Sequence, residues 1–195
     1  MPERIVVAMT GASGGIYGIR ALEVLRGIPQ VETHLIVSKG ARATLALETP
    51  YRLEEAHALA DVVHTDTNLA APISSGSFQV RGMLVAPCSV KTLSAIAVCD
   101  SGNLVARAAD VTLKERRPLV LLFRETPLHR GHLRIMQEAT EAGATVMPPV
   151  PAFYHLPKTI DDIVDQTIGR ALDQLGLDSG TVRRWTGATG PNSGS

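Results

Sequence analysis

The first residues that could do chemistry form a loop of small residues and hydroxyl groups near the start of the chain. Residues 10–18 read T-G-A-S-G-G-I-Y-G and follow the apolar run Ile5 to Met9. Glycines let a backbone approach a ligand closely, and a helix that begins behind such a loop presents free N–H groups and the positive end of its dipole. The pattern predicts a phosphate-binding turn between a strand and a helix.

The spacing of the glycines narrows the choice of ligand. Glycines at 11, 14, 15 and 18 do not form the G-x-G-x-x-G pattern of dinucleotide sites, and no Gly-Lys-Ser/Thr follows as in a P-loop. A nicotinamide site also needs an acid after the second strand, where this chain has Ser38-Lys39. Flavin mononucleotide (FMN), which has a phosphate but no adenosine ribose, fits better than NAD. An alternative stays open, because glycine-rich turns that bind nothing occur in many unrelated α/β proteins.

Two more loops bring reactive side chains to the same expected edge of a sheet. The stretch P-C-S-V-K-T (87–92) follows the apolar run 83–86, and Arg124-Glu125 follows the apolar run 118–123. Ligands of open parallel sheets bind at the carboxyl ends of the strands, and Ser89 would cap the helix that follows it. The Ser/Gly-rich stretch 73–78 is either a plain connection or a backbone segment that lies against a ligand.

Strand and helix patterns alternate along the chain. Strands are expected at 5–9, 33–37, 83–86, 118–123 and 144–147, with a short strand and turn within 61–68. Helices are expected at 16–25, 41–48, 53–59, 93–98, 103–115, 129–143 and 159–175. This order predicts an α/β protein with one doubly wound, Rossmann-like parallel sheet and helices on both faces. We expect a single domain over 1–186 and a mobile Gly/Ser/Thr-rich tail over 187–195.

Composition argues against several classes of function. Lys plus Arg and Asp plus Glu both number 19, so nothing indicates binding to nucleic acid or to an anionic membrane. Two cysteines, no signal-peptide pattern and no apolar run long enough to span a bilayer indicate a cytoplasmic protein. No metal is expected, because neither cysteine lies in a C-x-x-C pair and the histidines are scattered.

Several blocks of sequence are informative when taken together. They are T-G-A-S-G-G-I-Y-G (10–18), L-E-T (47–49), S-S-G-S-F (74–78), P-C-S-V-K-T-L (87–93), R-A-A-D-V-T-L-K-E-R-R-P-L-V-L (107–121), R-E-T-P-L-H (124–129), P-P-V-P-A-F-Y-H (148–155) and D-D-I-V-D-Q-T-I-G-R (161–170). From about Ile5 to Trp185 the chain resembles the flavin prenyltransferases, the accessory flavoproteins of ubiquinone-pathway and phenolic-acid decarboxylases. It departs from the family pattern at Gly15, where alanine is usual, and at Phe123.

The resemblance implies a reaction and its partners. Reduced FMN attacks dimethylallyl monophosphate, phosphate leaves, and the prenylated FMN passes to a partner decarboxylase, without a metal. The family also implies a large homo-oligomer such as a dodecamer, with sites shared between subunits.

Site residues are implied by position in the family's motifs. Those expected to contact FMN are Gly11, Ala12, Ser13, Ser38, Ser89, Val90, Lys91, Thr92 and Arg124. Those expected around the allylic phosphate are Arg107, Lys114, Glu125, Tyr154 and Arg170. Those expected in the reacting region are Ser13, Glu48, Glu125 and Trp185. Fixed cations and a phenol would stabilise the leaving phosphate, the carboxyl groups would move protons, and the Trp185 ring would face a cationic allyl fragment.

Other interpretations of these residues stay open. Arg107 and Lys114 lie seven apart and could be a solvated helix stripe, while Glu48 could be an ordinary acid at a helix end. Tyr154 and Trp185 could be packing residues. A carrier that binds FMN or its prenylated form without catalysis is the alternative function. An oxidative cysteine decarboxylase is disfavoured, because the chain lacks asparagine in the loops where that family carries it.

Overall fold

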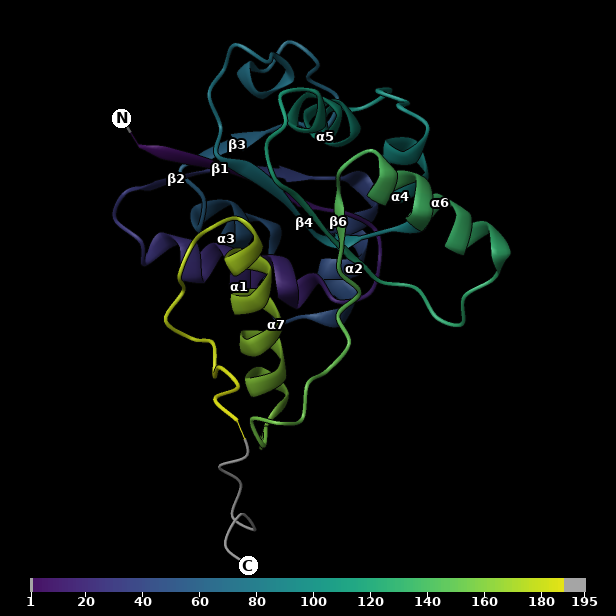
Figure 1. Ribbon diagram of the computed structural model, residues 1–195. Helices are drawn as coiled ribbons and strands as arrows, with labels where there is room; N and C mark the ends of the chain where they lie inside the picture. The colour runs from purple at the N-terminus through teal and green to yellow at the C-terminus, as the bar shows by residue number, and fades with distance from the viewer. Residues whose placement is uncertain (1, 188–195) are drawn as a thin grey trace, which may run out of the picture.

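A six-stranded parallel sheet forms the centre of the molecule in the computed structural model, which describes residues 2–187 (Figure 1). The strand order is β3-β2-β1-β4-β5-β6, and every neighbouring pair is parallel. The strands are β1 (Glu3–Met9), β2 (Val31–Val37), β3 (Val62–His64), β4 (Gly82–Cys88), β5 (Leu119–Phe123) and β6 (Thr145–Val146). The predicted doubly wound α/β fold is therefore confirmed.

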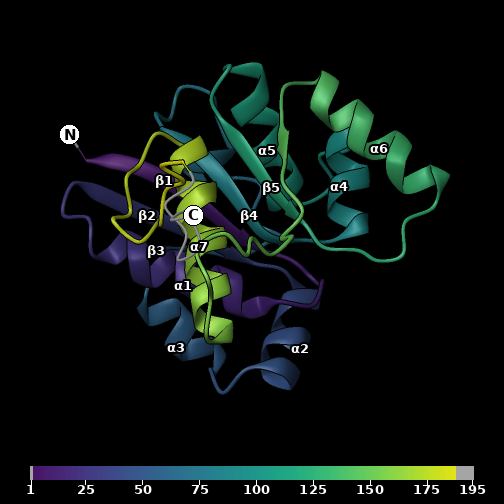
Figure 2. The ribbon, with the colours of Figure 1, turned by 60° about the horizontal axis from the view of Figure 1, so that its bottom comes forward.

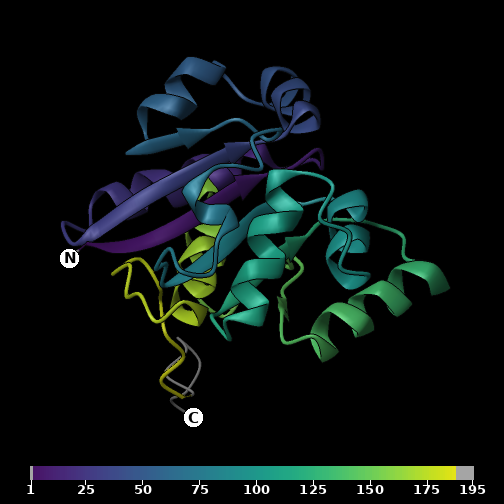
Figure 3. The same cartoon turned by 90° about the horizontal axis from the view of Figure 1, so that it is seen from above.

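Helices cover both faces of the sheet, as the alternation of side chains along β1 requires. Ile5, Val7 and Met9 belong to the cluster of buried side chains that includes α1 and α7, whereas Val6 and Ala8 belong to the cluster with α4, α5 and α6. Figure 2 shows α1 and α7 side by side, and Figure 3 shows α2 and α3 beside the β2–β3 end of the sheet. The helices are α1 (Gly15–Arg26), α2 (Lys39–Glu48), α3 (Leu53–Ala58), α4 (Val90–Ala97), α5 (Leu104–Lys114), α6 (Arg130–Glu141) and α7 (Ile160–Gln174).

The boundaries differ from the predicted ones at a few places. Helix α4 begins at Val90, three residues before the apolar pattern starts, because Ser89 accepts a hydrogen bond from the Thr92 N–H at 3.3 Å. The stretch expected to be a loop from 73 begins with a turn of 3₁₀ helix, η1 (Pro72–Ser74). Most of the expected mobile tail, 188–195, lies outside the described residues. Within 2–187, no helix is long and apolar enough to cross a membrane.

Helix α1 packs so closely on the sheet that one position admits no side chain. A Cβ at Gly18 would lie 2.5 Å from the Ala86 carbonyl oxygen and 2.6 Å from Met9 Cγ. The absent side chain lets α1 pack against the ends of β1 and β4, and α1 begins directly behind the glycine-rich loop. Gly18 therefore helps to fix where that loop lies.

We expect Gly18→Ala to lower the free energy of unfolding by about 1–3 kcal/mol, because the backbones of α1 and β4 must move apart. Gly15→Ala is the matched control on the same helix, since its nearest neighbour would be Leu45 Cδ1 at 3.4 Å, an ordinary contact. Denaturant unfolding followed by circular dichroism measures both variants. Equal stability of the two variants would contradict this account of the packing.

Candidate functional site

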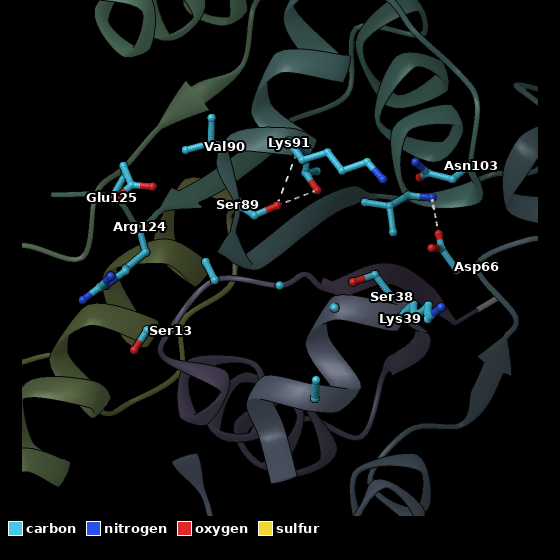
Figure 4. A pocket seen from close by; sticks show the side chains of 16 residues that line it. Ser13, Ser38, Lys39, Asp66, Ser89, Val90, Lys91, Asn103, Arg124 and Glu125 are labelled. Atoms are coloured by element: carbon cyan, nitrogen blue, oxygen red, sulfur yellow. Dashed lines mark hydrogen bonds between the residues drawn. The ribbon is translucent and has the colours of Figure 1, made fainter. Parts of the chain in front are cut away.

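A cavity of about 780 Å³ opens at the carboxyl ends of the strands (Figure 4). The strand order reverses between β1 and β4, and in open α/β sheets such a switch point is where ligands bind. The residues that line the cavity follow β1, β2, β3, β4 and β5 or begin α5. They are Gly11, Ala12, Ser13, Ser38, Lys39, Gly40, Ala43, Asp66, Ser89, Val90, Lys91, Thr92, Asn103, Val105, Arg124 and Glu125.

Thr10 joins the two central loops of this edge. Its hydroxyl donates to the Pro87 carbonyl at 2.8 Å and accepts from the Ser89 N–H at 2.8 Å, and the side chain is buried. The Thr10 N–H donates to the same carbonyl at 3.2 Å. The loops after β1 and β4 are thus held together, with the cavity in front of them.

Two helix N-termini point into the cavity. Ser38 caps α2 by accepting from the Ala41 N–H at 3.2 Å, and Ser89 caps α4 in the same way. Lys39 and Lys91, the first and second residues of these helices, also line the cavity. Free N–H groups, helix dipoles and ammonium groups on one wall suit a phosphate.

The opposite end of the cavity carries an acid, a guanidinium and a hydroxyl. Figure 4 shows Arg124 and Glu125 on the loop after β5, with Ser13 across from Arg124. The Arg124 N–H donates to the Cys88 carbonyl at 3.1 Å, which joins this loop to β4. Burial raises the pKa of the Cys88 thiol, so it stays protonated and is no nucleophile.

The residues predicted to contact FMN all line this cavity, and so does Glu125. Glu48 does not line it. Its carboxylate instead accepts a hydrogen bond from the Gly14 N–H at 2.7 Å, across 34 positions of sequence. Glu48 therefore supports the residue next to Ser13, at the margin of the cavity.

Arg107 and Lys114 lie on α5, against the stretch 74–78. Arg107 donates to the Ser74 carbonyl at 3.2 Å and pairs with Asp110 at 2.8 Å, whereas Lys114 pairs with Glu115. The first residues of α5 reach the cavity of this chain, but Lys114 ends the helix, about 15 Å further along its axis. One chain does not bring Lys114 to its own cavity.

Tyr154, Arg170 and Trp185 gather on the outer side of α7. The Tyr154 and Trp185 rings meet edge to face, with centroids 6.0 Å apart, and both side chains are exposed. Arg170 pairs with Asp173 at 2.7 Å, and hydrogen bonds from Arg184 and then Arg170 hold the pKa of Asp173 below its usual range. These three residues do not line the cavity of their own chain.

Sequence reasoning missed several residues that the structure brings to the cavity or to its surroundings. The cavity is also lined by Lys39, Gly40, Ala43, Asp66, Asn103 and Val105. Lys39, Gly40 and Asp66 follow strands, so their position at carboxyl ends was a usable signal. Arg117, which donates to the Gly76 and Phe78 carbonyls at 2.8 and 2.9 Å, carried no such signal.

Comparison with known proteins identifies the family. The sequence model of the family described as Flavoprotein matches residues 1–172. The flavin prenyltransferase UbiX of Escherichia coli K12 is 56% identical over 188 residues, which cover 95% of this chain and 100% of that protein. The chain belongs to the flavin prenyltransferase family.

Two solved structures resemble this flavin prenyltransferase family member over nearly their whole length. One is AnUbiX (PadA1) in complex with FMN and dimethylallyl pyrophosphate, with a TM-score of 0.94 and 54% sequence identity. The match covers 96% of this chain and 99% of the AnUbiX chain. The other is a dodecameric FMN-dependent UbiX-like decarboxylase from E. coli O157:H7, with a TM-score of 0.92 and 50% sequence identity. That match covers 94% of this chain and 100% of the decarboxylase chain. The family resemblance stated from the sequence is confirmed.

The N-terminus of α2 yields a test with two ligands that differ only by a phosphate. We expect Ser38→Ala to raise the Kd of FMN about fivefold to tenfold while the Kd of riboflavin changes less than about twofold, because a hydroxyl beside a helix N-terminus serves the phosphate. Calorimetric titration of the apoprotein measures both constants. An equal loss for both ligands would assign Ser38 to the fold and not to the phosphate.

Proposed function

We propose that this chain is a flavin prenyltransferase, which transfers the dimethylallyl group of dimethylallyl monophosphate to reduced FMN. The observation that carries the proposal is the cavity at the switch point, where the predicted FMN contacts and Glu125 come together. The identity to the E. coli flavin prenyltransferase and the likeness to AnUbiX, a complex with FMN and a prenyl donor, support it.

The cavity fits FMN in size and in chemistry. Its volume of about 780 Å³ lies within the range of small-molecule sites, roughly 300–1,000 Å³. Two capped helix N-termini with Lys39 and Lys91 suit the phosphate dianion, and the glycine-rich loop lets a flat ring approach the backbone. When bound, reduced FMN supplies the nucleophile of the reaction.

The residues at the other end supply charge and proton transfer. The Arg124 guanidinium favours negative charge on the departing phosphate, and Glu125 beside it can hold a proton for the leaving oxygen or accept one later. Ser13, which lines the same end of the cavity, has a hydroxyl that can donate or accept a hydrogen bond. The chemistry therefore belongs to this end of the cavity, and the opposite wall serves binding.

A second copy of the chain completes the site in this proposal. Lys114, Arg170, Tyr154 and Trp185 lie away from their own chain's cavity, and the two aromatic side chains are exposed. A neighbouring subunit can present them to the open side of the cavity, where the allylic phosphate binds. The dodecameric assembly of the UbiX-like relative supports such an arrangement.

The recipient of the product and the location of the protein are further parts of the proposal. A partner decarboxylase that depends on prenylated FMN would take up the product, because a modified flavin is useful only to an enzyme that binds it. A cytoplasmic location stays a prediction from composition. Binding of FMN without catalysis is the competing function.

The decisive experiment is an anaerobic incubation of the purified protein with reduced FMN and dimethylallyl monophosphate, followed by mass spectrometry of the released flavin. We expect a flavin heavier by one five-carbon unit. Dimethylallyl pyrophosphate is tested in parallel. Unmodified FMN with both donors would overturn the proposal and favour the carrier.

We expect Glu125→Gln to retain FMN affinity within about twofold and to lower kcat about a hundredfold or more, because it keeps the size of the side chain and removes its proton transfer. Glu54→Gln on α3, which does not line the cavity, is the matched control and keeps full activity. Single-turnover assays and flavin fluorescence titration measure the two effects. Normal turnover in Glu125→Gln would remove Glu125 from the mechanism.

A further inference from the structure

A buried glutamine links Tyr154, which is expected near the allylic phosphate, to the segment that carries Trp185. Gln166 lies on the face of α7 that the following segment, residues 177–185, covers, and its relative exposure is 4%. Its Nε2 donates to Tyr154 Oη at 2.8 Å and to the Arg183 carbonyl at 3.1 Å, and its Oε1 accepts from the Arg183 N–H at 2.9 Å. One side chain thus satisfies both backbone groups of Arg183 and reaches the phenol of Tyr154.

The orientation of this amide follows from its partners. A backbone N–H only donates and a backbone carbonyl only accepts, so rotating the amide by 180° would oppose both bonds to Arg183. The NH₂ group must therefore point towards Tyr154. The phenol oxygen accepts that hydrogen bond, so the phenol proton is not used by Gln166 and can be donated to another acceptor.

The same contact holds the segment that carries Trp185. Residues 177–185 run back along α7, and Gly169 permits this because a Cβ there would lie 2.5 Å from Val182 Cγ2. Arg184 binds Asp173 through two hydrogen bonds at 2.9 and 3.0 Å. Trp185 follows at once, with its ring against Tyr154 (Figure 2 shows this segment beside α7).

We propose that Gln166 is a positioning residue that makes Tyr154 a hydrogen-bond donor to the allylic phosphate and holds Trp185 beside it. This inference rests on the proposed function, in which Tyr154 donates to the leaving phosphate. Gln166 acts through Tyr154 and through the Arg183 backbone, and it needs no contact with the substrate.

Gln166→Glu tests the direction of the hydrogen bond. The carboxyl group keeps the length of the side chain and an acceptor for the Arg183 N–H, but where the amide nitrogen stood it has an oxygen that accepts the phenol proton. We expect kcat to fall about tenfold to a hundredfold, less than the roughly hundredfold to thousandfold loss when a preorganised donor is removed outright, because the phenol itself stays in place. The Kd of dimethylallyl monophosphate, measured by calorimetry on the FMN-loaded protein, should rise about fivefold.

Gln174→Glu is the matched control, because it makes the same chemical change on an exposed residue of the same helix. It should leave kcat and the Kd of dimethylallyl monophosphate unchanged. FMN content and the midpoint of thermal unfolding are recorded for both variants.

A double-mutant cycle with Tyr154→Phe separates positioning from plain packing. Once the phenol is absent, Gln166→Glu should lower kcat by a clearly smaller factor than in the wild-type background, because the Tyr154 donor is already lost and only the lost bond to the Arg183 carbonyl remains to be felt. Equal losses of kcat in the wild-type and Tyr154→Phe backgrounds would overturn the proposal.

Gln166→Met tests the same proposal if the buried carboxyl group of Gln166→Glu unfolds the protein. Methionine removes the bonds to Tyr154 and to the Arg183 backbone without giving the phenol proton a new acceptor, so the loss of kcat should be smaller than in Gln166→Glu and smaller again in the Tyr154→Phe background. Full activity in Gln166→Met and Gln166→Glu would overturn the inference. Failure of the proposed function is a different result, because the unaltered protein would then form no prenylated FMN.

Discussion

The hydrogen bonds of Thr10 join the loops after β1 and β4, at the point where the order of the strands in the sheet reverses. Parallel strands end at one edge, and the reversal between β1 and β4 opens a crevice there. Thr10 closes the base of that crevice by bonding the Pro87 carbonyl and the Ser89 N–H. The start of α4 is thereby fixed against the loop that leads into α1. The cavity, the helix N-termini and the position of Ser13 all depend on this junction.

One chain contains only a part of the proposed chemistry among its described residues. Groups suited to FMN and to proton transfer meet in its cavity, while Tyr154 and Trp185 lie on the outer side of α7. If a second subunit uses the Tyr154 and Trp185 rings, it becomes clear why a buried side chain holds rings that are themselves exposed. Gln166 is almost wholly buried, yet what it orders lies at the surface. A surface ordered at such cost in side-chain entropy is suited to a second subunit.

The fold and the wall of the cavity that faces a phosphate were predictable because their signals are local. Apolar runs predict the strands, Ser89 predicts the start of α4, and parallel pairing then brings the loops to one edge. The hydrogen bonds that the Gly14 N–H donates to Glu48 and the Arg183 N–H donates to Gln166 were not predictable, since they join residues 34 and 17 positions apart. The spacing of residue types along the sequence does not predict contacts between residues so far apart. The family resemblance supplied Tyr154, but not the group that orients it.

Charge is balanced locally at each cation expected to bind the allylic phosphate. Arg107 pairs with Asp110, Lys114 with Glu115 and Arg170 with Asp173. Each pair is at least partly open to solvent and adds little to stability, so in the proposed function a phosphate dianion would replace a carboxylate at little cost to the fold. Asp173 then keeps Arg184 as its partner, which leaves the segment before Trp185 in place. In the proposed function, affinity for the allylic phosphate would come from the arrangement of these side chains and not from a net positive charge, since acidic and basic residues are equal in number in the chain.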